Sequence, residues 1–185
     1  MRLFIGIALA PGAADTLKAL RERLAPSAVE LRWPEPPSWH VTLQFLGATT
    51  EVQAQCLLES LAHVRAPRVP IRIAGLGFFE RAGVFWAGVA LTPGLLALQQ
   101  SVLAATRACG FLPEPRPYSP HITLARVKGR GGPTALAPLK NAVERSRIDL
   151  NAAFTAEEFL LYESFPRPEG SRYEVRGAYP LFAAP

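Results

Sequence analysis

The sequence predicts an α+β fold of two pseudo-symmetric lobes, each an antiparallel sheet backed by helices, with a central cleft. Alternating apolar and polar residues predict strands, and apolar residues at helical spacing predict helices between them. The order helix, histidine-bearing strand, helix and strand pair occurs twice, with matching tetrads at 40–43 (HVTL) and 121–124 (HITL). We therefore expect an internal duplication, with residues 1–185 forming one bilobal domain and approximate halves at 1–91 and 92–185.

The first half contains clear local signals. Leu17, Leu20 and Leu24 repeat at helical spacing, and Thr50 with Gln53 forms a capping box that predicts the start of a helix. The expected elements are a strand at 2–9, a helix over 13–25, a strand at 39–47 that ends at a glycine, a helix from 50 to about 64, and strands near 69–79 and 83–91.

The second half repeats this order. Thr92 suits a helix cap, Pro93 suits the first helical position, and Gly110 suits the end of the same helix. The expected elements are a helix from 93 to 109, a strand over 118–127, a basic glycine-rich loop at 128–132, a helix from 133 to about 145, and strands near 154–164 and 172–182.

Composition indicates a folded protein that suits an anionic partner. Apolar residues make up 49% of the chain and charged residues 19%, which allows a packed core. The net charge of +5 suits RNA. The apolar run at 3–10 is too short for a signal peptide, and no stretch reaches about 18 apolar residues, so we expect a cytoplasmic protein without membrane contact. Cys56 and Cys109 lack C-x-x-C spacing, and we expect two buried, reduced thiols.

The two tetrads place their polar side chains on one face of each predicted strand, because side chains alternate along a strand. His40, Thr42 and Gln44 share one face of the first strand, and His121 and Thr123 repeat this arrangement in the second. The residues expected to point toward the core are Val41, Leu43 and Phe45 in the first strand and Ile122 and Leu124 in the second. If an approximate twofold axis relates the halves, the two polar faces meet across the cleft.

Two histidines and two threonines across a cleft suit acid–base chemistry on a phosphodiester. Imidazole has an ordinary pKa near ~6.5, so one ring can be neutral and the other protonated at cellular pH. The neutral ring takes a proton from the attacking water, and the protonated ring gives one to the leaving ribose oxygen. The predicted catalytic residues are therefore His40 and His121. Thr42 and Thr123 would bind the phosphate oxygens, and no metal or other cofactor is required.

The sequence resembles the two-histidine phosphoesterase superfamily, and within it the LigT-like RNA 2′,3′-cyclic phosphodiesterases, historically called 2′-5′ RNA ligases. The resemblance is carried by the stretches 1–5 (MRLFI), 40–47 (HVTLQFLG) and 118–126 (YSPHITLAR), and by the region 160–181. It implies hydrolysis of a terminal 2′,3′-cyclic phosphate on RNA to a 2′-phosphomonoester, with some members joining 2′-5′ linkages in reverse. It also implies that His121 is the base and His40 the acid, although the pseudo-symmetry leaves the opposite assignment open.

Arg126 matches the phosphate-contacting arginine of that family. Strict alternation puts it on the face opposite His121, so a β-bulge, or a side chain that wraps around the strand end, would have to bring it to the phosphate. Other side chains could contact the substrate, or could simply cover the edge of the core or form a solvated turn. These candidates are Gln44, Tyr118, Trp33, Arg32, Lys128 and Arg130.

Two other functions stay open on the sequence alone. A non-catalytic RNA-binding or phosphate-binding module would use the histidines only to hold a phosphate, and binding without turnover would identify it. A metallohydrolase would need metal ligands, but the sequence has no H-E-x-x-H motif and no obvious carboxylate ligand near either tetrad. We expect a monomer whose partners are RNA or nucleotides with 2′,3′-cyclic phosphate ends.

Overall fold

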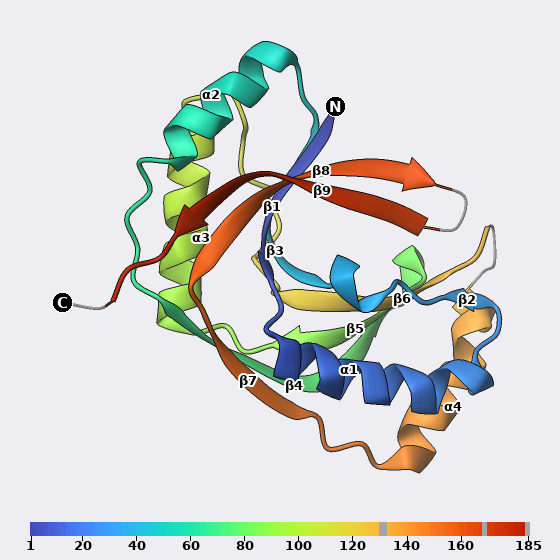
Figure 1. The fold of residues 1–185 in the computed structure, drawn as a ribbon. Helices are drawn as coiled ribbons and strands as arrows, with labels where there is room; N and C mark the ends of the chain where they lie inside the picture. The colour runs from blue at the N-terminus through green and yellow to red at the C-terminus, as the bar shows by residue number, and fades with distance from the viewer. Residues whose placement is uncertain (130–132, 168–169, 184–185) are drawn as a thin grey trace.

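The computed structural model describes residues 1–129, 133–167 and 170–183, and it shows two antiparallel sheets with helices packed in two pairs (Figure 1). One pair is α2 (Glu51–Leu61) with α3 (Pro93–Arg107), and the other is α1 (Pro11–Leu24) with α4 (Ala137–Ser146). Short 3₁₀ helices connect the main elements: η1 (Ala25–Ser27), η2 (Pro36–Ser38), η3 (Glu80–Ala82) and η4 (Pro133–Leu136). The predicted α+β class is confirmed.

The two sheets, called sheet A and sheet B below, each take strands from both halves of the chain. Sheet A has the strand order β3-β1-β8-β9, with β1 (Arg2–Ala8), β3 (His40–Ala48), β8 (Glu158–Arg167) and β9 (Gly170–Pro180). Sheet B has the order β2-β6-β5-β4-β7, with β2 (Leu31–Arg32), β4 (Val69–Phe79), β5 (Val84–Val89), β6 (His121–Val127) and β7 (Asn151–Ala156). The equivalent runs of strand, helix, histidine strand and helix begin at β1 and at β5. The duplication itself, with halves at 1–91 and 92–185, stays a prediction.

One hydrophobic core connects both sheets with the helices. Its buried side chains come from each of α1 to α4 and from both sheets, and Ile5, Phe85 and Phe159 are completely buried in it. A second, small cluster contains Phe4, Leu160 and Tyr162. Because Phe4 alternates with the core residues of β1, this small cluster lies on the other face of sheet A, and that face also carries the first histidine.

The predicted helix starts are confirmed at the atomic level. Thr50 and Gln53 form the reciprocal capping box at the start of α2, and the Thr92 side chain accepts the Leu95 N–H at the start of α3. Gly83 joins η3 to β5 with a φ of 61°, which is a left-handed conformation that glycine adopts without steric strain. The hairpin between β4 and β5 is therefore specified locally.

The strand predicted at 154–164 is wrong, because the chain changes sheets inside it. Residues 151–156 form β7 beside β4 in sheet B, and residues 158–167 form β8 beside β1 in sheet A. Glu157 and Glu158, both exposed, lie between buried Ala156 and Phe159. Two consecutive exposed charges interrupt the period of two, and this was the available sign of the break. The two-residue strand β2 was also missed, since so short a strand leaves no periodic pattern.

The prediction of two reduced thiols is wrong as well. Cys56 on α2 and Cys109, just after α3, form a disulfide with a Cα–Cα distance of 5.7 Å. The two helices pack side by side, so residues 53 apart in sequence come together. Spacing along the chain cannot reveal a pairing that depends on helix packing.

Among the described residues, no helix combines the length and the apolar character needed to cross a lipid bilayer.

Candidate active site

The two histidine strands come together where sheet A meets sheet B. Strands β3 and β6 pack against each other, and Tyr118 Oη, just before β6, donates a hydrogen bond of 2.9 Å to the Thr42 carbonyl oxygen. Positive charge on His121 and on Arg126 lowers the pKa of His40. His40, His121 and Arg126 are therefore close enough for the charge of one group to act on another.

Each histidine is held by the same local hydrogen bond. His40 Nδ1 lies 2.8 Å from the Ser38 carbonyl oxygen, and His121 Nδ1 lies 2.8 Å from the Ser119 carbonyl oxygen. A carbonyl oxygen can only accept, so each Nδ1 carries the proton and each Nε2 is left for chemistry. The repeated Ser-x-His pattern is the feature of the sequence that indicates this support.

The surroundings of the two rings differ. His40 packs against aromatic rings on sheet A, with centroid distances of 4.6 Å to Phe4, 5.2 Å to Tyr173 and 5.9 Å to Tyr162. This burial is the main reason that the pKa of His40 falls to about 4, with the hydrogen bond to Ser38 opposing the fall and the charges of His121 and Arg126 adding to it. In the absence of an anion His40 is therefore neutral at pH 7.

His121 has a more open aromatic border, and it lies beside a glycine of the neighbouring strand β5. The edge of Phe79 lies 4.9 Å from the His121 ring, and Trp86 lies 6.3 Å away. Gly88 is the register partner of His121. A Cβ at Gly88 would come within 2.7 Å of the Ala74 carbonyl oxygen, so glycine permits the close approach of β4.

Both histidine strands contain a bulge at the leucine of the tetrad. In β3, Thr42 pairs with Gly6 and Gln44 with Ile5, so Leu43 has no register partner. In β6, Leu124 is skipped in the same way between partners on β5. The burial patterns of the first six residues of the two strands are identical. A bulge places two consecutive side chains on the inner face and reverses the alternation beyond it.

The bulge in β3 corrects two predictions made from strict alternation. Gln44 does not share the face of His40: it is 7% exposed, and its Oε1 accepts a 2.7 Å hydrogen bond from Thr106 Oγ1 on α3. Phe45 does not point into the core, because it is 64% exposed. Phe45 is the residue that sequence reasoning missed. Its position in the tetrad repeat, HVTLQF against HITLAR, is equivalent to that of Arg126.

The bulge in β6 brings Arg126 to the face that carries His121. Along β5, which has regular alternation here, Val84 pairs with Arg126 and Trp86 pairs with Thr123. Since paired residues share a face, Arg126 and Thr123 point to the same side of sheet B as His121. Of the two possibilities left open by the sequence, the bulge is the one observed.

The other predicted contact residues have structural partners. The Tyr118 hydroxyl is used in the bond to Thr42. Trp33 packs edge-on against the core residue Phe85, with ring centroids 5.9 Å apart. The Lys128 ammonium donates to the Val29 carbonyl oxygen at 2.7 Å. Arg130 lies outside the described residues.

A surface depression of about 80 Å³ adjoins the His40 side of the site, and its lining includes Phe4, Phe45, Tyr173 and Arg2. Phe4 stacks on Tyr162, and its ring centroid lies 6.0 Å from that of the exposed Phe45. The depression therefore has aromatic walls and one cationic side chain, which suits a nucleobase attached to a phosphate. Over the described ranges, no group of three His, Cys, Asp or Glu residues is arranged to hold a metal ion.

Comparison with known proteins agrees with this geometry. Residues 7–86 and 89–173 match the family model described as LigT like Phosphoesterase. The chain belongs to this family. Each matched segment of the LigT-like chain contains one of the two tetrads.

Relatives and solved structures of LigT-like proteins cover nearly the whole chain. The RNA 2′,3′-cyclic phosphodiesterase of Aeropyrum pernix is 32% identical over 174 residues, which are 88% of this chain and 95% of that protein. The RNA 2′,3′-cyclic phosphodiesterase of Geobacillus stearothermophilus is 32% identical over 187 residues, which are 98% of this chain and 58% of that longer protein. The crystal structure of E. coli LigT complexed with 3′-AMP has the same fold, with a TM-score of 0.78 and 24% identity over 97% of both chains.

Proposed function

We propose that this chain is an RNA 2′,3′-cyclic phosphodiesterase that opens a terminal 2′,3′-cyclic phosphate to a 2′-phosphomonoester. The observation that carries the proposal is the pair of interacting imidazoles, each with Nδ1 held by a backbone carbonyl and Nε2 left for chemistry. The relatives named above carry the same activity in their names. The chemistry needs one proton acceptor and one proton donor at a single phosphorus, which such a pair supplies.

In the proposed reaction, water attacks the phosphorus while His121 Nε2 takes a proton from it. The bond from phosphorus to the 3′ oxygen breaks, and His40 Nε2 gives a proton to that oxygen. Arg126 and the hydroxyls of Thr42 and Thr123 stabilise the charge that grows on the non-bridging oxygens. The same steps with a 5′-hydroxyl in place of water would join a 2′-5′ linkage, with the 3′ oxygen again leaving as a hydroxyl.

The low pKa of His40 adds a condition to this assignment. At a pKa of about 4 the ring is unprotonated at pH 7, so it can act as the acid only after it gains a proton. A bound phosphate supplies negative charge beside the ring and raises its pKa. We therefore expect proton uptake when a nucleoside 2′-phosphate binds, measurable by calorimetry in buffers of different ionisation enthalpy. Proton uptake that persists in His40→Ala would assign the acid role to another group.

The main test is turnover of adenosine 2′,3′-cyclic phosphate in the presence of EDTA. The wild-type protein should form adenosine 2′-monophosphate, and His40→Ala and His121→Ala should each lose at least about 100-fold in kcat. His63→Ala is the matched control, because His63 is an exposed histidine bonded to the Glu59 carbonyl outside the site. Binding without turnover would instead favour a phosphate-binding module, and loss of activity in EDTA would indicate a metal.

The proposal includes action as a monomer, without metal, on RNA ends in the cytoplasm. A single chain supplies both histidines, so the site is complete in one copy. Activity that stays proportional to protein concentration, with a sedimentation coefficient for about 20.1 kDa, would support the monomer.

A further inference from the structure

We propose that Arg32 binds the phosphodiester on the 5′ side of the cyclic phosphate, and so makes the site prefer RNA ends to mononucleotides. This inference rests on the proposed function and adds to it a second anion subsite. Arg32 lies beside Arg126 in sheet B.

Arg32 lies on the same face of sheet B as the site. It is the register partner of Arg126 in the antiparallel pair of β2 and β6, and directly paired residues point to one side of a sheet. Arg126 shares its face with Thr123 and His121, as shown above from the register with β5. Arg32 is therefore one strand farther from the histidine than Arg126 is.

Two adjacent guanidinium groups repel each other unless negative charge lies near them. Among the described residues, no carboxylate forms an ion pair with Arg32 or Arg126. Glu35, which follows β2 in the sequence, is already paired with another arginine. Arg21 donates to both of its carboxylate oxygens, at 2.9 and 2.7 Å. An uncompensated arginine pair of this kind suits an anion with oxygens for both side chains, such as an RNA backbone.

The number of negative charges on the substrate equals the number of guanidinium groups only when the substrate contains a second nucleotide. A terminal cyclic phosphate carries one negative charge, and Arg126 together with the two threonines and two histidines already surrounds it. The next negative charge in RNA is the phosphodiester one nucleotide away. Arg32, one strand away from Arg126, is placed for that second charge.

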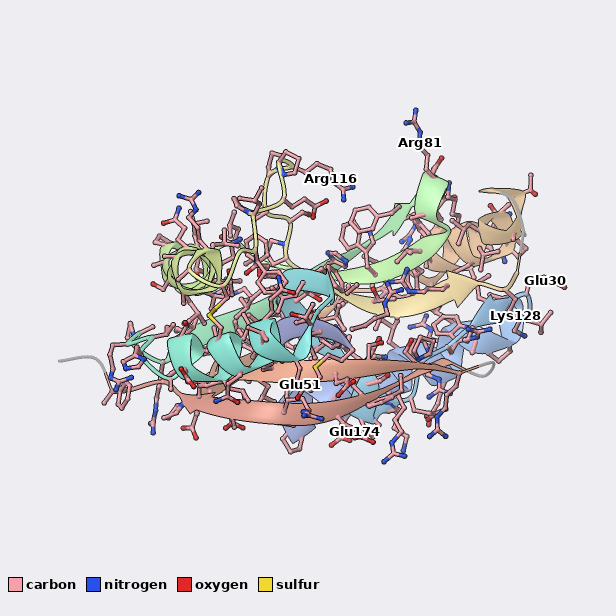
Figure 2. The ribbon with its side chains drawn as sticks, turned by 90° about the horizontal axis from the view of Figure 1, so that it is seen from above. Glu30, Glu51, Arg81, Arg116, Lys128 and Glu174 are labelled. Atoms are coloured by element: carbon pink, nitrogen blue, oxygen red, sulfur yellow. A yellow bond between two sulfur atoms is a disulfide. The ribbon has the colours of Figure 1, made fainter. Side chains whose placement is uncertain are left out.

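Arg32 also lies at the border of the site, where the next nucleotides of a longer RNA would extend out of the site. Strand β2 is the edge of sheet B, and a Cβ at Gly170 would lie 3.8 Å from Arg32 Cδ. The start of β9 in sheet A therefore approaches the stem of Arg32, so this side chain marks the junction of the two sheets. Figure 2 shows Glu30 and Lys128 at this end of the molecule, and the Lys128 N–H bonds the Glu30 carbonyl.

The test compares two substrates that differ by one charged linkage. Adenosine 2′,3′-cyclic phosphate has only the reacting phosphate, and the dinucleotide ApA with a 2′,3′-cyclic end has one phosphodiester more. We expect Arg32→Ala to lower kcat/KM for the dinucleotide by about 10-fold, the effect of one charge-assisted hydrogen bond. It should change kcat/KM for the mononucleotide by less than about 2-fold. The control is Arg107→Ala, which removes the same charge from an exposed position on α3, away from β2 in Figure 1.

A second comparison removes the charge from the substrate instead of from the protein. With an uncharged methylphosphonate in place of the internal phosphodiester, the wild type should lose the same factor of about 10, and Arg32→Ala should lose nothing more. For the charged dinucleotide, kcat/KM should fall less steeply with salt concentration in Arg32→Ala than in the wild type. On logarithmic axes the two slopes should differ by about 0.7, as expected for the loss of one phosphate contact on a single strand.

The outcomes separate this inference from the proposed function. Equal losses for mononucleotide and dinucleotide would place Arg32 on the reacting phosphate and overturn the inference, and so would no loss for either substrate. If the wild type turned over neither substrate, the proposed function would fail first. Normal mononucleotide turnover by Arg32→Ala would show that the variant is folded.

Discussion

Acidification should destabilise the fold through His40. Burial holds the pKa of this ring at about 4 in the folded protein, against an ordinary value of 6.5. Between these two pH values the unfolded chain binds a proton that the folded chain does not bind. The stabilisation is therefore fully present above about pH 6.5 and is lost as the pH falls toward 4.

The size of this effect follows from the same interval. At about 1.4 kcal/mol for each pH unit, the interval from 6.5 to about 4 corresponds to a loss of about 3 kcal/mol. That is a large part of the ~5–15 kcal/mol by which domains are stable. The ring is half-buried, so about 2 kcal/mol is a reasonable lower figure after solvent screening.

Urea denaturation at several pH values from 4 to 8 measures the effect directly. Other groups also titrate in this range, so the useful quantity is the difference between the wild type and His40→Gln, whose side chain cannot be protonated. The free energy of unfolding of the wild type should fall more steeply below pH 6.5 than that of the variant. His63→Gln, at an exposed histidine, should keep the wild-type slope. Identical slopes for wild type and His40→Gln would refute the assigned burial of the ring.

Four changes test other parts of the structure. Arg126→Lys should lower kcat/KM by about 10- to 100-fold in a cyclic phosphate assay, because lysine cannot form two parallel bonds to a phosphate; an unchanged rate would remove Arg126 from the phosphate. Phe45→Ala should slow turnover by about 10-fold through lost base stacking while urea stability stays constant, since the ring is 64% exposed; a stability loss without a rate effect would contradict this. Thr106→Val should lower the free energy of unfolding by about 1–3 kcal/mol, because its buried glutamine partner loses a hydrogen bond, and an unchanged urea midpoint would argue against that bond. Replacing both Cys56 and Cys109 with serine should lower the free energy of unfolding by about 2–4 kcal/mol, and dithiothreitol should have the same effect on the wild type. A wild-type urea curve insensitive to dithiothreitol would argue against the disulfide.

The sequence predicted the elements whose information is local. The capping box at Thr50 and the cap at Thr92 each depend on a few neighbouring residues, and the structure has both of them. The tetrad repeat also located both histidines, and the structure brings them together. Each histidine is the first residue of its strand, so the bulge that follows it does not change the face on which it lies.

The incorrect predictions depended on partners distant in the sequence. The bulges at Leu43 and Leu124 appear only when the register with β1 and β5 is known, and without them Gln44 and Phe45 are assigned to the wrong faces. The exchange of sheets at Glu157 likewise depends on which strand is available as a neighbour.

The repeated crossing of the chain between the two sheets constrains how the molecule can move. The chain passes from β1 in sheet A to β2 in sheet B, returns to β3, and crosses again to β4 and back at Glu157. Several covalent connections thus span the junction that carries the histidines, so a wide hinge opening would strain them all. The two histidines proposed as catalytic should keep a nearly constant spacing during turnover, and the substrate must adapt to a preformed site. Since β1 pairs with β8 across more than 150 intervening residues, that spacing also arises late in folding, when contacts of long sequence separation form.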